Sequence, residues 1–341
     1  MIVLLSGAKK NIGDYLITER ARKLFDHLLD DEIIILDRFN NLESDIHLIN
    51  SARFLVLCGG PAYASDIYKG IYPLVDDLSK LKVPIIPFGL GWCGRPFNPM
   101  EFKFNNDSKR LLDNIHSTIE NSSCRDDITR NVLSNCGYKN VSMTGCPVWY
   151  DIDSIGKDFK SKKEIKKIVF TTAADPKLII QTYLLIKSVN KYFPNAEITM
   201  SYHRGIFPDK YTTYRATIGY LLMYGAAKLI NRKIKIKDVA YELDKLDFYD
   251  DCDFHIGYRV HAHLYFLSKR LPSILVNEDG RGKGMVQTMS LPVFNIEDND
   301  MILKVDNQLK DYKETNFSGF IETGRYIDKQ FSVMKNFITK L

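Results

Sequence analysis

Short apolar runs alternate along this chain with longer segments whose apolar residues recur at helical spacing. The runs at 2–6, 32–37, 54–60 and 83–91 predict buried strands, and residues 14–29 predict an amphipathic helix between the first two. Such strands are apolar on both faces, as in a parallel sheet that helices cover on both sides. The first part of the chain is therefore predicted to be an α/β unit.

Further patterns complete this unit. The sequence predicts helices over about 66–81 and 107–119, and two more strands at 122–127 and 141–145 with a helix between them. Residues 154–167 then interrupt the pattern, because they are rich in Lys and contain no apolar run. This interruption predicts a linker between two domains.

The pattern starts again after the linker. Strands are predicted at 167–173, 196–202, 253–257 and 272–278. Helices are predicted at about 177–192, 211–230, 240–247, 259–270 and 298–312, followed by an amphipathic helix at 321–341. The second part of the chain is therefore a second α/β unit of similar size.

These patterns predict the domain organisation. Residues 1–153 form an N-terminal Rossmann-like domain, 154–166 the linker, 167–320 a C-terminal Rossmann-like domain and 321–341 a last helix. A chain of 341 residues suits two domains of about 150 residues each. The fold class we expect is α/β, with two Rossmann-like domains of mostly parallel sheets that face each other across a cleft. Functional residues should directly follow the strands, because ligands bind such folds at the carboxyl ends of the strands.

The composition narrows the class of partner. Hydrophobic residues make up 45% of the chain and charged residues 26%, which is typical of a globular protein and excludes a disordered or fibrous one. The 47 Lys and Arg exceed the 42 Asp and Glu by five. This small excess suits a small anionic substrate or a membrane surface, and it does not favour nucleic acid.

The cysteines favour a reducing compartment and no metal site. All six stand apart, without a CxxC pair or a cysteine–histidine cluster at zinc spacing. A nucleophilic cysteine is a minor alternative, because each cysteine lies in or beside an apolar, strand-like run. The N-terminus opens with a strand rather than a signal peptide, and no run is long enough to span a membrane, so we expect a cytoplasmic protein.

Two glycine motifs follow predicted strands. Residues 89–94 fit the pattern GxGxxG, but Pro96 directly after them opposes the helix that a dinucleotide-binding motif requires. We interpret the motif as a glycine-rich turn at the cleft, where the backbone near Gly91 can contact a ligand. Gly59 and Gly60 likewise allow another group to approach the backbone closely.

Polar residues also stand at the start of the first predicted helix, from Asn11 to Asp14. Asn and Asp commonly cap helices, which is one interpretation. The other is functional, since an amide and a carboxylate at the cleft can bind sugar hydroxyls or take a proton from one. Asp151 and Asp153 resemble the acidic pair of a metal–nucleotide site, but their place beside the linker favours a solvated hinge.

Two arginines directly follow strands. Arg125 comes after an apolar run, where an arginine commonly binds a carboxylate or phosphate through two parallel hydrogen bonds. The structural alternative is an ion pair with a neighbouring Asp. Arg204 follows another predicted strand of the second domain, and it either lines the same cleft or lies in an exposed turn.

The densest group of candidate residues lies at 253–284. Arg259, His261 and His263 are predicted in the first turns of a helix, where backbone amides and a guanidinium favour an anion and a histidine can donate a proton. By helical spacing, Arg259 and His263 share a face and His261 points elsewhere. Lys283 lies in a glycine-broken loop that can close over a phosphate, although the segment does not match a P-loop. We therefore predict an anion site here.

One apolar segment has two interpretations. Residues 216–230 are strongly apolar, and the basic sequence NRKIKIK follows them. The segment is either a core helix or a peripheral membrane contact in which the basic residues meet anionic lipid.

Together these motifs resemble the polysaccharide pyruvyl transferase family. The matching residues are, in chain order, Asn11, Gly13 and Asp14 of N-x-G-D; Gly59 and Gly60 after a strand; Gly89 and Gly91; Arg125 and Asp126; and Asp253, Ile256, Gly257, Arg259, His261 and Ala262 of a strand and helix start that read D-x-x-I-G-x-R-x-H-A. Lys283 matches a downstream Lys. The resemblance covers most of 1–295, and its R-x-H-A segment is the most specific part.

This resemblance implies a fold, a reaction and a set of roles. The fold would be that of the GT-B glycosyltransferases, and the enzyme would move a pyruvyl group from phosphoenolpyruvate to two hydroxyls of a sugar, in the synthesis of bacterial capsule, exopolysaccharide or cell-wall polymer. Phosphate would leave, a ketal would form, and no metal or organic cofactor would be needed. The roles implied are His261 as acid and Asp14 as base; Arg259, Arg125, Lys283 and Arg204 for phosphoenolpyruvate; and Asn11, Gly13, Gly59, Gly60 and Gly91 for the acceptor, on the N-terminal domain.

Two alternatives stay open at this point. One is a GT-B-type glycosyltransferase that uses a nucleotide sugar, and the other is a non-catalytic carbohydrate-binding protein. The sequence does not identify the sugar, its hydroxyl pair, the ketal stereochemistry, the oligomeric state, or whether a lipid or a nucleotide carries the acceptor. The expected place of action is the cytoplasm or the inner face of the membrane.

Overall fold

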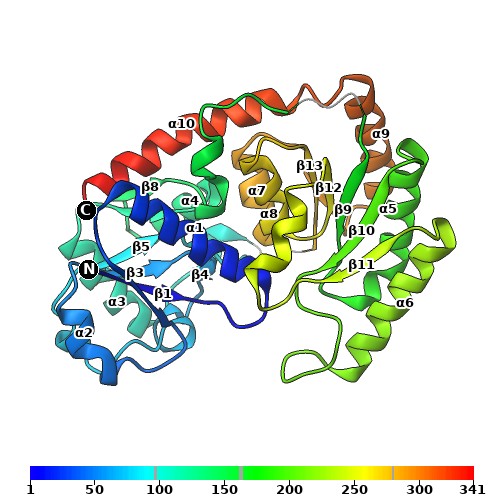
Figure 1. The fold of residues 1–341 in the computed structure, drawn as a ribbon. Coiled ribbons are helices and arrows are strands. Elements are labelled where there is room, and N and C mark those ends of the chain that lie inside the picture. The colour runs from blue at the N-terminus through cyan, green and yellow to red at the C-terminus, as the bar shows by residue number, and fades with distance from the viewer. Residues whose placement is uncertain (96–97, 161–163, 279) are drawn as a thin grey trace.

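Two parallel sheets form the two halves of the molecule (Figure 1). The structure, a computed structural model, describes residues 1–95, 98–160, 164–278 and 280–341, and the side chains of residues 280 and 281 lie outside the described part. The first sheet has the order β2-β1-β3-β5, and the second the order β11-β10-β9-β12-β13-β14. Each pairing within them is parallel, which confirms the predicted α/β class.

Most strands of the two large sheets match the apolar runs of the sequence. The first sheet contains β1 (Ile2–Ser6), β2 (Ile33–Asp37), β3 (Leu55–Cys58) and β5 (Ile85–Phe88). The second contains β9 (Lys167–Thr171), β10 (Glu197–Tyr202), β11 (Lys235–Asp238), β12 (Phe254–Gly257), β13 (Ser273–Asn277) and β14 (Phe294–Asn295). Two short parallel pairs join β4 (Pro61–Tyr63) with β6 (Gly91–Trp92), and β7 (Ser122–Cys124) with β8 (Val141–Met143).

Helices connect and cover the strands. They are α1 (Ile12–Leu28), α2 (Ile46–Asn50), α3 (Asn106–Thr118), α4 (Asp127–Asn135), α5 (Ile179–Tyr192), α6 (Tyr214–Ile230), α7 (Val260–Ser268), α8 (Gly280–Thr288), α9 (Met301–Glu314) and α10 (Phe320–Thr339). Strand β1 is buried at every residue because α1 and its neighbours enclose it. The domain boundaries read from the sequence stay a prediction, and residues 161–163 of the predicted linker lie outside the described residues.

Several elements differ from the prediction. The helix expected at 240–247 is wrong, because the segment forms a 3-10 helix at Leu243–Tyr249. Strands β11 and β14 were not expected. The helix expected at 66–81 is wrong: the segment forms a π-helical turn at Ile67–Ile71 and a 3-10 turn at Leu78–Lys80, because Gly70 and Pro73 interrupt it. The core-helix interpretation of 216–230 is also wrong. Helix α6 buries only three side chains, packs Ala216, Tyr224 and Ile230 partly against the core, and exposes a stripe of large apolar residues on its other side.

The solvated hinge expected at Asp151 and Asp153 is wrong for Asp151, whereas Asp153 is exposed. Asp151 is buried and forms an ion pair with Arg20 of α1, while its other oxygen accepts a hydrogen bond from Ser154 at 2.6 Å. The Arg20 guanidinium also lies 5.5 Å from the centre of the Tyr265 ring of α7. This aspartate therefore belongs to a buried contact that joins α1, the linker side of the first half and α7.

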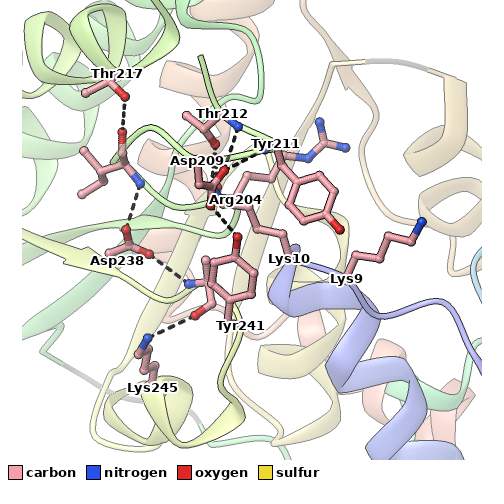
Figure 2. A network of polar contacts seen from close by, with 12 residues as sticks. Lys9, Lys10, Arg204, Asp209, Tyr211, Thr212, Thr217, Asp238, Tyr241 and Lys245 are labelled. Carbon is pink, nitrogen blue, oxygen red and sulfur yellow. Dashed lines mark hydrogen bonds and ion pairs between the residues drawn. The ribbon is translucent and has the colours of Figure 1, made fainter. Parts of the chain in front are cut away.

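A second contact joins the halves near the ends of β1 and β10 (Figure 2). Lys10 Nζ lies 2.8 Å from Asp209 Oδ2 and donates to Thr212 Oγ1 at 2.5 Å. Both partners belong to the second half, in the loop before α6. The backbone amide of Ile12 donates to the carbonyl of His203 at 3.1 Å. The loop after β1 is thus fixed against the second half of the chain.

The last helix also crosses between the halves. In Figure 1, α10 (red) runs from α9 back to the first sheet. Phe337 stacks on Phe88 of β5 with the ring centres 6.2 Å apart, and Asp328 pairs with the buried Arg270 after α7. Lys157 of the predicted linker accepts a hydrogen bond from Arg270 at 3.2 Å. Arg270 therefore connects the predicted linker to the C-terminal helix.

Buried neutral histidines lie beneath the second sheet's carboxyl edge. The hydroxyl of Ser273 lies 2.7 Å from Nδ1 of both His255 and His263, and Thr171 contacts the other nitrogen of His255 at 2.8 Å. Burial lowers the pKa of His263 to about 3, and it lowers the pKa of His255 well below its usual value. Both rings are therefore neutral in the folded protein.

These histidines predict an acid-sensitive fold. A folded-state pKa below the unfolded value of about 6.5 gives stability that is complete above that pH and lost as the pH falls, at up to about 1.4 kcal/mol per pH unit for each histidine. His263→Gln should show a shallower loss of unfolding free energy between about pH 6 and pH 5 in urea titrations. The exposed His27 of α1 provides the control: His27→Gln should keep the wild-type slope. Equal slopes for all three proteins would contradict the prediction.

Candidate anion site between the two halves

A cavity of about 220 Å³ opens where the carboxyl ends of the two sheets meet. Its walls come from both halves, as expected for two Rossmann-like units facing each other. The lining residues are Asn11, Asp14, Arg38, Pro61, Arg125, His203, Arg204, Tyr258, Arg259, Val260, His261, Asn277, Glu278, Gly282 and Met285. Six of the residues predicted to form the site therefore lie together: Asn11, Asp14, Arg125, Arg204, Arg259 and His261.

Positive charge dominates this cavity. Arg38 follows β2 and Arg125 follows β7, while Arg204 and Arg259 follow β10 and β12. The lining carboxylates are those of Asp14 and Glu278. Because guanidinium groups bind carboxylates and phosphates in a two-point geometry, such a cavity favours a ligand that carries more than one negative charge.

Arg125 forms the ion pair of the structural interpretation and also lines the cavity, as the functional interpretation requires. Its side chain is buried, its Nε lies 3.0 Å from Asp126 Oδ2, and its Nη2 donates to the Trp92 carbonyl at 3.1 Å. An ideal Cβ on Gly91 would lie 1.8 Å from Arg125 Nε. Gly91 therefore provides the space in which Arg125 lies, rather than lining the cavity itself.

Arg259 is held in place by its backbone and by a carboxylate. It is the residue before α7, with extended dihedral angles, and its amide donates to Thr171 Oγ1 at 3.1 Å. Its Nη1 lies 3.8 Å from Glu278 Oε2, and Glu278 in turn accepts a hydrogen bond from the amide of Ala174. Arg259 thus stands at the N-terminus of α7, where the helix dipole adds to its positive charge.

His261 lines the cavity beside Arg259, and His263 does not. The expectation that Arg259 and His263 share a face is wrong, because Arg259 precedes the helix in an extended conformation and does not follow helical spacing. His263 is buried against Ser273 instead. An ideal Cβ on Gly13 would lie 2.4 Å from His261 Nδ1. The start of α1 therefore contacts His261 at the start of α7, and only glycine fits between them.

His203 adds a neutral ring to the cavity. It is buried, and its Nε2 lies 2.8 Å from the hydroxyl of Tyr249. Burial lowers its pKa well below the usual value, and the positive charge of Arg259 and the nearby His255 and His261 lower it further. This ring can donate or accept one hydrogen bond toward a ligand without adding charge.

The first turn of α1 presents polar groups to the cavity. The side chain of Asn11, the residue before α1, makes no capping hydrogen bond, so the capping interpretation is wrong for it. Its Nδ2 instead donates to Asp14 Oδ2 at 3.2 Å. The Asp14 carboxylate is therefore oriented by a neighbouring amide at the edge of the cavity.

Three predicted site residues lie elsewhere. An ideal Cβ on Gly59 would meet Ile17 of α1 at 2.2 Å, so this glycine allows close packing of α1. Gly60 has a φ of +76°, a backbone conformation that favours glycine. Lys283 is exposed, outside the cavity lining. The loop expected to close over a phosphate is wrong, because its residues belong to α8, whose backbone stays helical despite the glycines.

Several lining residues were not candidates in the sequence, among them Arg38, Asn277 and Glu278. Arg38, Asn277 and Glu278 all stand at the carboxyl end of a strand, two of them directly after it. The rule that functional residues follow strands would have found them. None of them forms a motif with its neighbours, which is why the sequence did not single them out.

The cysteines do not line this cavity among the residues described. Burial raises the pKa of Cys146 to about 11, and it raises the pKa of Cys58 and Cys124 further. Thiols with such pKa values are poor nucleophiles near neutral pH, so the alternative of a catalytic cysteine has no support here. Within the same described residues, no helix has the length and hydropathy of a membrane span.

The fold is similar to that of known sugar enzymes. S. aureus MnaA, in a co-structure with UDP, has a TM-score of 0.57 at 11% identity, over 95% of this chain and 90% of that chain. The UDP-GlcNAc 2-epimerase from Neisseria meningitidis, bound to UDP-GlcNAc, has a TM-score of 0.57 at 11% identity over all of both chains. Anabaena Alr3699/HepE, in complex with UDP and glucose, has a TM-score of 0.54 at 9% identity, over 99% and 97% of the two chains. At these identities the similarity shows a GT-B-type fold and nothing finer.

The sequence comparison is more specific. No curated protein matches this chain. A family model described as polysaccharide pyruvyl transferase matches residues 11–280, which include both halves of the cavity and every predicted site residue except Lys283. The chain therefore belongs to the polysaccharide pyruvyl transferase family.

Proposed function

We propose that this protein transfers a pyruvyl group from phosphoenolpyruvate to two hydroxyls of a sugar, forming a cyclic ketal in the synthesis of a bacterial surface polysaccharide. The observation that carries this proposal is the convergence of four arginines from both halves around His261 and Asp14. Phosphoenolpyruvate carries a phosphate and a carboxylate on three carbons. Few other small donors require so many cationic groups in a cavity of about 220 Å³.

The donor would bind on the side of the second half. Arg259 stands at the N-terminus of α7 and Arg204 follows β10, so both face the cavity from that half. Arg125 would reach it from the opposite wall. Asp126 and Glu278 already neutralise part of this charge, which suits a ligand that must bind and then leave as free phosphate.

Proton transfer would begin the reaction. His261, in the protonated form, would give its proton to the methylene carbon of phosphoenolpyruvate, and C2 would become an oxocarbenium centre beside the carboxylate. A sugar hydroxyl would attack C2 while Asp14 accepts its proton. The second hydroxyl would then displace phosphate and close the ketal, and its proton would leave with the phosphate. The fixed positive groups would stabilise the phosphate as it departs, and these steps require no metal or organic cofactor.

The acceptor would bind against the first half, where Asn11, Asp14 and Arg38 line the cavity. Arg38 stacks beside two rings, with its guanidinium carbon 4.8 Å from the centre of Phe39 and 5.4 Å from that of Tyr72. Within the described residues it forms no ion pair. An acceptor that carries an anionic group would therefore find a partner at Arg38.

One experiment separates the proposed function from its alternatives. The purified protein is supplied with phosphoenolpyruvate and a panel of sugars, and both phosphate release and the mass of the product are measured. A product whose mass fits a pyruvyl ketal supports the proposal. Calorimetry that detects nucleotide sugars and no phosphoenolpyruvate would instead indicate a glycosyltransferase, and a carbohydrate ligand without turnover would indicate a binding protein.

We expect His261→Asn to lower kcat by about 100-fold or more, since a positioned acid contributes roughly 10² to 10⁴ to the rate. The unfolding midpoint and the affinity for phosphoenolpyruvate should change little, because His261 is half-buried at the cavity wall. His116→Asn, which alters a histidine remote from the cavity on α3, is the matched control and should retain activity. Full activity of His261→Asn would exclude this residue as the acid.

Gly13→Ala tests the contact between the two helix starts. The new methyl group would lie 2.4 Å from His261 Nδ1, so the imidazole must move. We expect kcat to fall about tenfold or more, because misplacement of a reacting group by about 1 Å has effects of this size. Gly225→Ala is the control, since an ideal Cβ there meets nothing within 4 Å and should leave kcat unchanged. Equal activity of the two variants would contradict the assigned position of His261.

Two arginine variants test the division of the cavity. Arg38→Gln should raise the KM for the sugar acceptor about tenfold and leave the KM for phosphoenolpyruvate unchanged, while Arg259→Gln should do the reverse. A tenfold change in KM is the size of effect expected when a hydrogen bond to a charged group is lost. Arg110→Gln on the exposed surface of α3 is the control. If both variants affect the same substrate, donor and acceptor are not divided between the halves in this way.

A further inference from the structure

Helix α6 exposes an apolar stripe that the proposed reaction does not use. One side of the helix is buried against the rest of the second half through Tyr220, Met223 and Ala227. The opposite side carries large apolar residues at helical spacing, between 47% and 85% exposed: Ile218, Leu221, Leu222 and Leu229. A surface helix ordinarily has one apolar side, so the second side is available to a partner.

The exposed surface extends beyond the helix. Phe207, Tyr211 and Tyr214, in the loop before α6 and at its first residue, are also exposed. Gly219 lies against Pro176, where an ideal Cβ would come within 2.5 Å, and this places the start of α5 with its exposed Ile180 beside α6. We call this surface the α6 face: Ile180, Phe207, Tyr211, Tyr214, Ile218, Leu221, Leu222 and Leu229.

The charged side chains on the two helices of the α6 face, α5 and α6, are all positive. Neither α5 nor α6 contains an Asp or Glu. Exposed or half-buried cations surround the apolar residues: Lys177, Lys187, Lys210, Arg215, Lys228, Arg232 and Lys233. Among the described residues, Arg215 and Lys233 form no ion pair with a carboxylate. The nearby carboxylates are those of Asp175 and Asp209 in the flanking segments. The surface therefore combines exposed Leu, Ile, Phe and Tyr side chains with an excess of positive charge.

We infer that the α6 face binds the surface of an anionic lipid bilayer. Apolar side chains flanked by Lys and Arg are what a helix lying in the interface requires, with the side chains below the headgroups and the cations among them. A second copy of this chain fits less well, because a symmetric contact would place Arg215 and Lys228 against like charges. The inference goes beyond the proposed reaction and does not depend on it.

The position of this surface relates it to the cavity. Arg204 lines the cavity, and Phe207 is exposed only three residues later, in the loop that leads to α6. The same loop is fixed to the first half through Asp209 and Lys10 (Figure 2). Docking of the α6 face on a bilayer would therefore hold one edge of the cavity near the lipid headgroups.

The test is flotation of the full-length protein with vesicles. The protein should float with vesicles of phosphatidylcholine and phosphatidylglycerol in equal parts, and much less with phosphatidylcholine alone. High salt should weaken binding, because it screens the cations. Leu222→Glu should reduce the bound fraction by about tenfold or more, because the change removes an apolar contact and adds a repelled charge. Arg215→Gln combined with Lys233→Gln should weaken binding to the anionic vesicles specifically.

Matched variants elsewhere on the surface are the controls. Leu303→Glu alters an exposed leucine of α9, and Lys329→Gln with Lys335→Gln removes two exposed cations of α10; both should float like the wild type. Circular dichroism confirms that each variant is folded. Failure of the wild type to float, or equal loss in the control variants, overturns the inference. So does light scattering that shows a dimer which Leu222→Glu converts to a monomer, because the α6 face would then bind a second copy.

Discussion

The contact between Gly13 and His261 fixes the geometry of the site. The two residues begin helices from different halves of the chain, and the imidazole lies where any side chain at residue 13 would be. Both helices therefore present their positive N-terminal ends to the same cavity, α1 with Asp14 in its first turn and α7 with Arg259 directly before it. The arginines can converge only because the backbones approach this closely. A glycine is required at that point for the same reason.

When no ligand is bound, neighbouring carboxylates must neutralise part of the positive charge of these arginines. Asp126 beside Arg125 and Glu278 beside Arg259 do so from within the wall, and the buried His203 stays neutral. Buried ion pairs of this kind add little net stability, because the desolvation of both groups offsets their attraction. What they do here is hold the guanidinium groups in fixed orientations. A ligand with two anionic groups can then bind without first having to reorganise the site.

The sequence predicts those parts of the fold and site that depend on local pattern. Apolar runs located most strands of the two large sheets, and the position of Arg125 and Arg259 within two residues of a strand end placed both at the cavity. Contacts between distant segments were not predictable in this way. Arg38 has no motif around it, and the burial of Asp151 depends on Arg20, 131 residues away. Helical spacing placed His263 rather than His261 beside Arg259, and this failed because Arg259 is extended and precedes the helix.

The three connections between the halves bear on how a substrate enters. Arg20 with Asp151, Lys10 with Asp209, and α10 with β5 lie at separate places, so no single loop can act as a hinge while the others stay intact. Opening the buried pair of Arg20 and Asp151 would leave a charge without its partner in a poorly solvated environment, which is costly. Opening the contact of α10 with β5 would expose the rings of Phe337 and Phe88 to water. The pair of Lys10 and Asp209 differs, because Lys10 is buried but Asp209 is exposed, so that water can solvate the aspartate when the pair opens. Motion that admits a bulky sugar should therefore occur at the loop between β10 and α6, the segment that connects the cavity to the α6 face.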